Sequence, residues 1–162
     1  MVTKKIRILL IFNKIKELYT DLFYYIHLYK YRKILIQYAK DRFIKIVYGK
    51  AGDFPGSVGE WDSEINEIHI VKPCRANHYL PPHLKCKYSL EQEVLILLHE
   101  LGHVNLGHCN TSGLNKRKIY TDEINAWKAT IELKNKLKFT KLKHFDKQIN
   151  HFINYILVDL LF

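Results

Sequence analysis

The sequence has few of the residues that cross-link, bend or interrupt a chain. Its 162 residues include three cysteines, four prolines and seven glycines, and its longest uninterrupted apolar runs are five residues. A membrane-spanning helix needs about 20 apolar residues, so the sequence predicts no transmembrane segment, and the amino terminus does not resemble a signal peptide. An odd number of cysteines without a two-residue spacing is untypical of a disulfide framework or a cysteine zinc ribbon. We therefore expect free thiols and a cytoplasmic location.

The glycines and prolines that are present lie in the middle of the chain. All of them fall between residues 49 and 113, so the two flanks lack the residues that break helices. With 48% apolar residues, the composition indicates one globular domain. We predict a helical segment at residues 1–42, a core at 43–132 and a second helical segment at 133–162. Net charge follows a similar division, with +9 on residues 1–50, −4 on 51–110 and +5 on 111–162.

Apolar residues in the first segment recur every three or four positions, as they do in an amphipathic helix. These residues are Ile6, Leu9, Leu10, Ile15, Leu18, Leu22, Phe23, Ile26, Tyr29 and Ile34. We expect this apolar stripe to pack against the domain and the lysines to face solvent. Two alternatives stay open, because a basic helix rich in tyrosine also suits an anionic membrane surface or a nucleic acid.

Three short stretches, at residues 43–48, 57–61 and 66–71, have the alternating pattern of strands. The last two are joined through Asp62, Ser63 and Glu64, which are favoured in turns. The pattern predicts a small antiparallel sheet, and the proline-containing segment 72–88 is predicted to be a loop. The fold class is therefore α+β.

Residues 99–103 read His-Glu-Leu-Gly-His. On a helix, His99 and His103 project from the same face one turn apart, so that both imidazoles can bind one zinc ion. Glu100 then lies beside the metal. Ser89 is typical of an N-cap, so we predict a helix from about Leu90, and Gly107 is placed to end it.

A third zinc ligand is predicted on the next helix. Gly102 costs about 1 kcal/mol relative to alanine inside a helix, which indicates that another backbone approaches closely there. The next helix is predicted to begin after Thr121 and carries Glu123, with the small residue Ala126 one turn later. Two histidines and one carboxylate leave the fourth zinc position open, as in catalytic sites. Asp122 is the alternative third ligand, about 100° around the helix.

The remaining histidines give weaker signals. His108 lies five residues after His103, whereas the third histidine of the astacin and matrixin pattern lies six residues after the second. We interpret His108 as part of the helix end or the rim of the cleft. The other six histidines have no partner at ligand spacing and are interpreted as surface or core residues.

The segment His99-Glu-Leu-Gly-His103, followed by Glu123-x-x-Ala126, resembles the gluzincin branch of the zincin metallopeptidases and, within it, the small ImmA/IrrE-like proteins. The resemblance covers about residues 43–132 and includes a strand, Asn66–Ile70, upstream of the motif. It implies a zincin-like fold with a small antiparallel sheet packed on the active-site helix. It also implies a soluble, cytoplasmic protein of bacteria or their mobile elements, a group in which some members cleave or inactivate repressor proteins.

These observations predict a zinc metalloendopeptidase that hydrolyses a cytoplasmic protein or peptide, with one Zn²⁺ per chain held by His99, His103 and Glu123. Zinc lowers the pKa of a bound water and polarises the scissile carbonyl. Glu100 is the predicted general base, and Tyr120 is the candidate oxyanion stabiliser. An edge strand within residues 57–71 is expected to align the substrate.

The alternative function is non-catalytic. In it, the zinc-containing fold is a scaffold for a regulatory protein that binds nucleic acid or an acidic partner through its basic helical arms. Nucleic acid is not the favoured partner, because the lysines are spread along helices and no RNA-binding signature is present. The oligomeric state is not predicted.

Overall fold

The computed structural model describes residues 2–49, 58–71, 89–109 and 114–161. Within these residues the fold is α+β, as predicted. The helices are α1 (Val2–Lys40), α3 (Ser89–Leu106), α4 (Lys116–Lys136) and α5 (Phe145–Leu161), and the strands are β1 (Lys45–Gly49), β2 (Gly59–Asp62) and β3 (Glu67–Val71). The predicted loop at 72–88 lies outside the described residues, as do Cys74 and Cys86. Cys109 is an exposed free thiol, as predicted.

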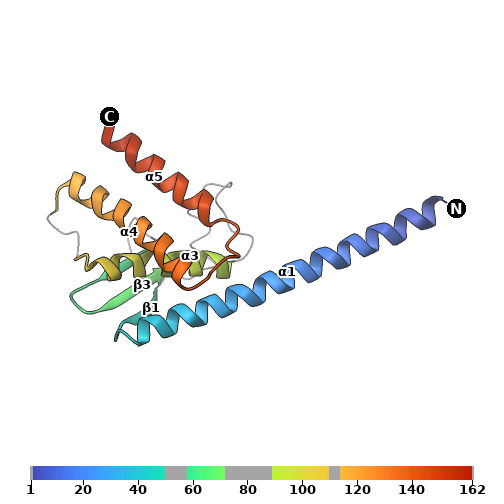
Figure 1. Cartoon of the computed structure of the whole chain (residues 1–162), viewed down its shortest axis with the longest axis horizontal. Coiled ribbons are helices and arrows are strands. Elements are labelled where there is room, and N and C mark those ends of the chain that lie inside the picture. Colours follow the sequence, from blue (N-terminus) through green and yellow to red (C-terminus); the bar gives the residue numbers. More distant parts are fainter. Residues whose placement is uncertain (1, 50–57, 72–88, 110–113, 162) are drawn as a thin grey trace.

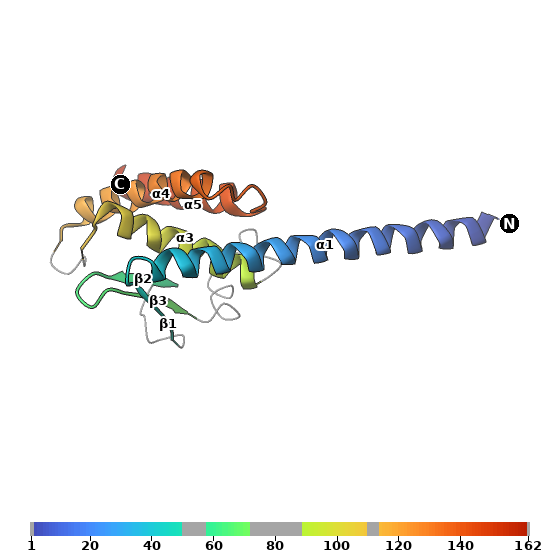
Figure 2. The same cartoon turned by 60° about the horizontal axis from the view of Figure 1, so that its bottom comes forward.

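Helix α3 is the centre of the molecule. Figure 2 shows the sheet on one side of α3 and helices α4 and α5 on the other, while α1 runs alongside. The apolar residues of α3 fill the core between these layers, as predicted, and they are Val94, Leu95, Leu97, Leu98 and Leu101. Gly107 follows the helix with a φ of 64°, the left-handed conformation predicted for its end. The helix itself begins at Ser89 rather than at Leu90.

The sheet is mixed, so the prediction of an antiparallel sheet is wrong for one pair of strands. The strand order is β1-β3-β2, with β2 antiparallel to β3 and β1 parallel to β3. Alternation of apolar and polar residues is the same in both kinds of pairing and therefore does not fix strand direction. Because β3 is central, β2 forms one edge of the sheet.

Helix α4 begins before the predicted N-cap Thr121, so that prediction is wrong. Asn115 is the N-cap, and its side chain accepts a hydrogen bond of 2.8 Å from the backbone N–H of Lys118. The Thr121 hydroxyl instead donates to the backbone carbonyl of Arg117 within the helix, at 2.8 Å. Glu123 consequently lies in the second turn of α4. This helix also continues past the predicted boundary at residue 132, and α5 forms the rest of the C-terminal helical segment.

Helix α1 has 39 residues and is therefore about 58 Å long. Its second half packs against the domain through five buried residues, Tyr24, Leu28, Tyr31, Leu35 and Ala39. Its first half projects beyond the rest of the molecule (Figure 1). The expectation that the apolar stripe packs against the domain is therefore wrong for most of it. Leu18, for example, is 64% exposed.

The projecting half of α1 is nevertheless no membrane span. Within the described part of the chain, every helix is either too short or too polar to cross a bilayer.

Candidate metal centre

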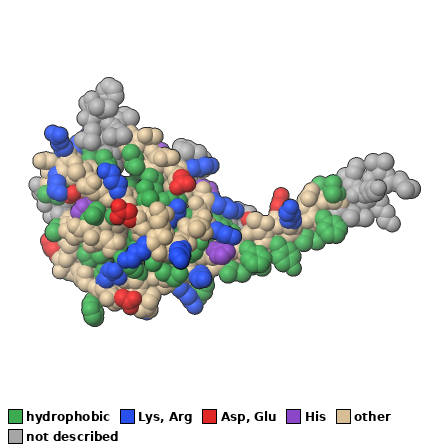
Figure 3. Space-filling model, viewed as in Figure 1, with side chains coloured by type: hydrophobic (Ala, Val, Ile, Leu, Met, Phe, Trp, Pro, Cys, Tyr) green, Lys and Arg blue, Asp and Glu red, His purple; other side chains and the backbone are tan. Residues whose placement is uncertain are grey.

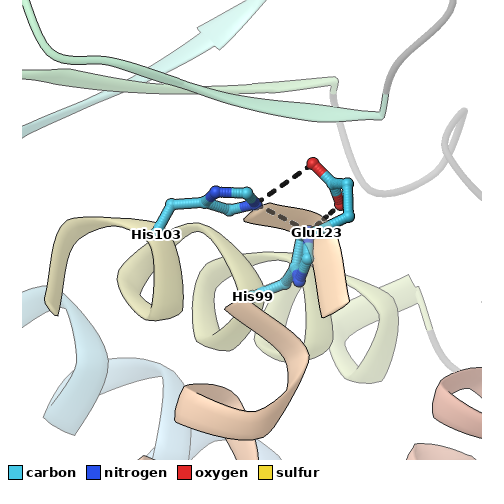
Figure 4. A group of neighbouring side chains, drawn as sticks. All are labelled: His99, His103 and Glu123. Atoms are coloured by element: carbon cyan, nitrogen blue, oxygen red, sulfur yellow. Dashed lines mark hydrogen bonds and ion pairs between the residues drawn. The ribbon is translucent and has the colours of Figure 1, made fainter. Parts of the chain in front are cut away.

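Three side chains from two helices point at one another (Figure 4). His99 and His103 come from α3, and their Nε2 atoms are 3.2 Å apart. Glu123 comes from α4, with one carboxylate oxygen 3.1 Å from Nε2 of His99 and the other 3.3 Å from Nε2 of His103. The three residues form a group that could hold a metal ion, and they are the three that the sequence predicted as ligands.

The helices are brought together at Gly102. A Cβ atom built on this residue would lie 2.5 Å from the backbone oxygen of Ala126 and 2.6 Å from Oγ1 of Thr130. The close backbone approach predicted at Gly102 is thus confirmed, and its neighbour is the residue expected from the Glu123-x-x-Ala126 pattern. The Thr130 hydroxyl donates to the Ala126 carbonyl at 2.7 Å. The close approach at Gly102 sets the distance between α3 and α4, and so the distance between Glu123 and the histidines.

An aromatic stack holds the ring of His99. It lies on Trp127, with ring centres 4.1 Å apart, and Trp127 lies on Phe152 of α5. Among the described residues, Nδ1 of His99 is buried and has no hydrogen-bond partner. The ring is therefore oriented by packing, with its other nitrogen directed at Glu123. Nothing in the sequence indicated this stack, since Phe152 is 25 residues from Trp127.

His103 is held by a chain of polar side chains that sequence analysis did not find. Its Nδ1 lies 2.9 Å from Nδ1 of His108. Nε2 of His108 in turn lies 3.7 Å from Oδ1 of Asp122. The same oxygen forms an ion pair of 2.6 Å with Nζ of Lys118. His108 reaches this position because the chain turns back after Gly107, where its N–H donates to the carbonyl of His103 at 3.1 Å. Asp122, the alternative third ligand, therefore supports His103 indirectly and lies outside the group of three.

The electrostatics of the group favour a deprotonated carboxylate. Burial alone raises the pKa of Glu123, but hydrogen bonds from His103 and His99 and the charges of both rings outweigh it and hold the pKa well below its usual value. Burial lowers the pKa of His103, yet Glu123 and the nearby carboxylates of Glu100 and Asp122 raise it overall. The two histidines therefore stabilise the charged form of the Glu123 carboxylate.

Glu100 lies beside the group in a buried position. Its side chain is 5% exposed, and this burial raises its pKa above the usual value, against the opposing charges of His99 and His103. Strand β2 passes close by, because a Cβ atom built on Gly59 would lie 2.8 Å from Oε1 of Glu100. The edge strand of the sheet is thus directly adjacent to Glu100.

Solvent reaches the group from the side of Glu123. This side chain keeps 32% of its surface exposed, against 13% for His99 and 11% for His103. Tyr120, the candidate oxyanion stabiliser, lies one turn before Glu123 on α4 and is half-buried, with the Lys116 ammonium 5.4 Å from its ring centre.

The chain matches no protein-family model, no curated protein and no solved structure.

Proposed function

We propose that this chain is a zinc-dependent metallopeptidase of the gluzincin type, resembling the ImmA/IrrE-like proteins, that hydrolyses a protein or peptide. The observation that carries the proposal is the spacing of the three donor groups. Ligand atoms on a tetrahedral zinc ion, with bonds of about 2.0–2.2 Å, are separated by about 3.3–3.5 Å. The distances of 3.1–3.3 Å among His99, His103 and Glu123 are close to these values.

The number and kind of donors also support catalytic zinc. Two neutral imidazoles and one carboxylate suit zinc, and structural zinc sites normally have a fourth protein ligand. The described residues supply three, and the exposed side of Glu123 leaves room for a water or substrate. When bound, zinc would lower the pKa of that water and polarise a peptide carbonyl.

Glu100 is the proposed general base. It follows His99 directly in the chain, and its burial raises its pKa above the usual value, which favours uptake of a proton. In this role it takes a proton from the attacking water and delivers it to the leaving amine. Tyr120 is the proposed oxyanion stabiliser, since it lies one helical turn from Glu123.

Strand β2 is the proposed alignment site for the substrate. It is an edge of the sheet, and its first residue, Gly59, lies next to Glu100. An extended peptide that pairs with the side of β2 on which the described residues place no strand would pass the general base. The small size of Gly59 lets strand and helix approach, because a Cβ there would also lie 2.4 Å from the side chain of Ile96.

The test compares wild type with Glu100→Gln after zinc loading, using a proteome-derived peptide library and mass spectrometry of new termini. We expect wild type to generate cleaved peptides and Glu100→Gln to generate none, with equal zinc content and thermal stability. Glu93→Gln is the matched control, because Glu93 is a buried glutamate of the same helix that pairs with Arg32, away from the group. It should cleave like wild type.

Cleavage by Glu100→Gln at the wild-type rate would contradict the mechanism. A second outcome is also informative. If the protein binds one zinc per chain but every peptide cleaved by wild type is also cleaved by Glu100→Gln, or none is cleaved, the non-catalytic regulatory function replaces the peptidase proposal.

A further inference from the structure

The projecting half of α1 carries a surface of large apolar side chains that the metal centre does not involve. They lie between residues 11 and 29 and are 44–66% exposed. Figure 3 shows most of the apolar side chains along one side of this arm, and Leu9, Leu10 and Phe23 are further exposed apolar residues outside the stripe. The members of this stripe are Ile11, Phe12, Ile15, Leu18, Tyr19, Leu22, Tyr25, Ile26 and Tyr29. Monomeric proteins rarely expose a continuous apolar surface of this extent.

The stripe repeats every seven residues. Ile15, Leu22 and Tyr29 occupy one heptad position, called a, and Ile11, Leu18 and Tyr25 occupy position d. Phe12, Tyr19 and Ile26 fill position e next to them. Alternating steps of three and four residues between positions a and d are the pattern of a seam between two long helices.

The stripe faces away from the domain. The five residues that pack α1 against the rest of the chain are centred about 150° around the helix from the stripe, at 100° per residue. A second long helix can therefore lie along the stripe without displacing α3 or the sheet. The arm also supplies enough surface. At about 100 Å² of exposed area each, nine side chains offer about 900 Å², and a stable interface needs about 800 Å² per partner.

Charges beside the stripe favour one arrangement of two copies. Lys14 and Asp21 share heptad position g. In an antiparallel pair with Ile15 opposite Leu18 and Ile11 opposite Leu22, each Lys14 lies beside the other chain's Asp21. Shifting the pair by one heptad in either direction places Lys14 beside Lys14 or Asp21 beside Asp21, which is unfavourable.

Along the stripe itself the charges are balanced, which favours a second helix over an anionic membrane surface. Helices that lie on anionic lipids have a polar face rich in lysine and arginine. Residues 9–29 carry two lysines, Lys14 and Lys16, and two acids, Glu17 and Asp21, so the net charge beside the stripe is zero, whereas Lys4, Lys5 and Arg7 make the start of α1 basic.

From these observations we infer that the chain forms a homodimer in which the α1 arms of two copies pair antiparallel along the stripe. The domains then lie at opposite ends of the paired arms, and both metal centres stay accessible. This inference is independent of the proposed peptidase activity.

Sedimentation velocity of the full-length protein over a wide concentration range tests the dimer. We expect wild type to dimerise and Leu18→Glu/Leu22→Glu to raise the dimer dissociation constant by at least about 100-fold. The matched control is Asn13→Glu/Thr20→Glu, which adds the same charges at position f, away from the stripe, and should still dimerise. A monomeric wild type, or equal effects of both double variants, overturns the inference.

Cross-linking tests the direction of pairing. The native cysteines, Cys74, Cys86 and Cys109, are first replaced by serine. Under mild oxidation, a mixture of Ile11→Cys and Leu22→Cys chains should then form mixed disulfide dimers, and Ile11→Cys alone should not. A parallel pair would give the reverse result and overturn the arrangement.

Exchange of the two charges tests the register of the pair. Lys14→Asp or Asp21→Lys alone should weaken the dimer, and the double exchange should restore it.

Co-sedimentation with phosphatidylglycerol vesicles tests the alternative of a membrane role. Vesicle binding by a protein that stays monomeric without lipid overturns the inference.

Discussion

The metal centre buries charged groups, whereas the α1 arm exposes apolar ones, and each arrangement by itself is unfavourable. At the metal centre, charged and polar groups are buried, with Glu100 at 5% exposure, Asp122 at 7% and His103 at 9%. On the α1 arm, apolar groups are exposed, with Phe12 at 66% and Leu18 at 64%. Burying charge and exposing large apolar side chains both cost free energy. Each end therefore carries groups that a partner would stabilise, and the partners that we propose are a metal ion at the centre and a second helix on the arm.

The largest effect is expected at the third ligand. Glu123→Ala should weaken zinc binding by more than the about 10–100-fold typical for a residue that only supports a ligand. Asp122→Ala should weaken it by about tenfold or less, because its carboxylate acts on His103 through His108. Zinc titration with a competing chelator measures both. A large loss in Asp122→Ala with Glu123→Ala unaffected would reverse the assignment.

The two halves of α1 can be compared with one type of substitution. Leu28→Ala should reduce the free energy of unfolding by about 2–5 kcal/mol, because Leu28 is fully buried. Leu18→Ala should change it by less than about 0.5 kcal/mol. Urea unfolding at concentrations where the protein is monomeric gives both values. Similar losses in the two variants would show that the arm is folded against the domain.

A smaller effect is expected where α3 meets α4. Gly102→Ala should reduce the free energy of unfolding by about 1–3 kcal/mol, because its methyl group would overlap the backbone of Ala126. It should also weaken zinc binding, since Glu123 moves with α4. Gly107→Ala is the control, because a Cβ there meets no atom within 4 Å, so only the cost of its left-handed backbone applies. If Gly102→Ala binds zinc like Gly107→Ala, the helix contact does not position the ligand.

The smallest effect is a pH dependence near the base of the arm. Tyr48 donates a hydrogen bond to Glu93 and accepts one from Arg32, and burial together with Glu93 raises its pKa to about 12. An unfolded tyrosine titrates near pH 10, so the folded chain holds this proton more tightly. The stabilisation is complete below about pH 10 and is lost between about pH 10 and 12. In Tyr48→Phe the free energy of unfolding should fall less between about pH 10 and 12 than in wild type. The difference should be less than about 1 kcal/mol, because Tyr48 is 37% exposed. Identical alkaline unfolding curves for both proteins would contradict this.

The parts of the fold that depend on local spacing were predictable. Two histidines four residues apart share a helix face whatever the rest of the chain does, and Gly102 indicated where the next helix touches α3. The start of α4 was not predictable, because Asn115 and Thr121 are both favoured N-caps and tertiary packing decides between them. Strand direction in the sheet was not predictable either, since the alternating pattern does not encode it.

The support for His103 and the orientation of α1 depend on contacts between distant residues. His108 had the wrong spacing for a ligand, and its contact with His103 results from the turn after Gly107. The apolar periodicity of α1 correctly predicted a helix, but periodicity does not show which part of the molecule packs against its apolar face. The structure places its buried face elsewhere, on Tyr24, Leu28 and Tyr31.

Native mass spectrometry of the zinc-loaded protein is the most direct test of the central claim that His99, His103 and Glu123 form a zinc site. The wild-type chain should carry one zinc ion, and the His99→Ala/His103→Ala chain should carry none at the same zinc concentration. A wild-type chain without zinc, or a double variant that keeps one ion per chain, would contradict the account.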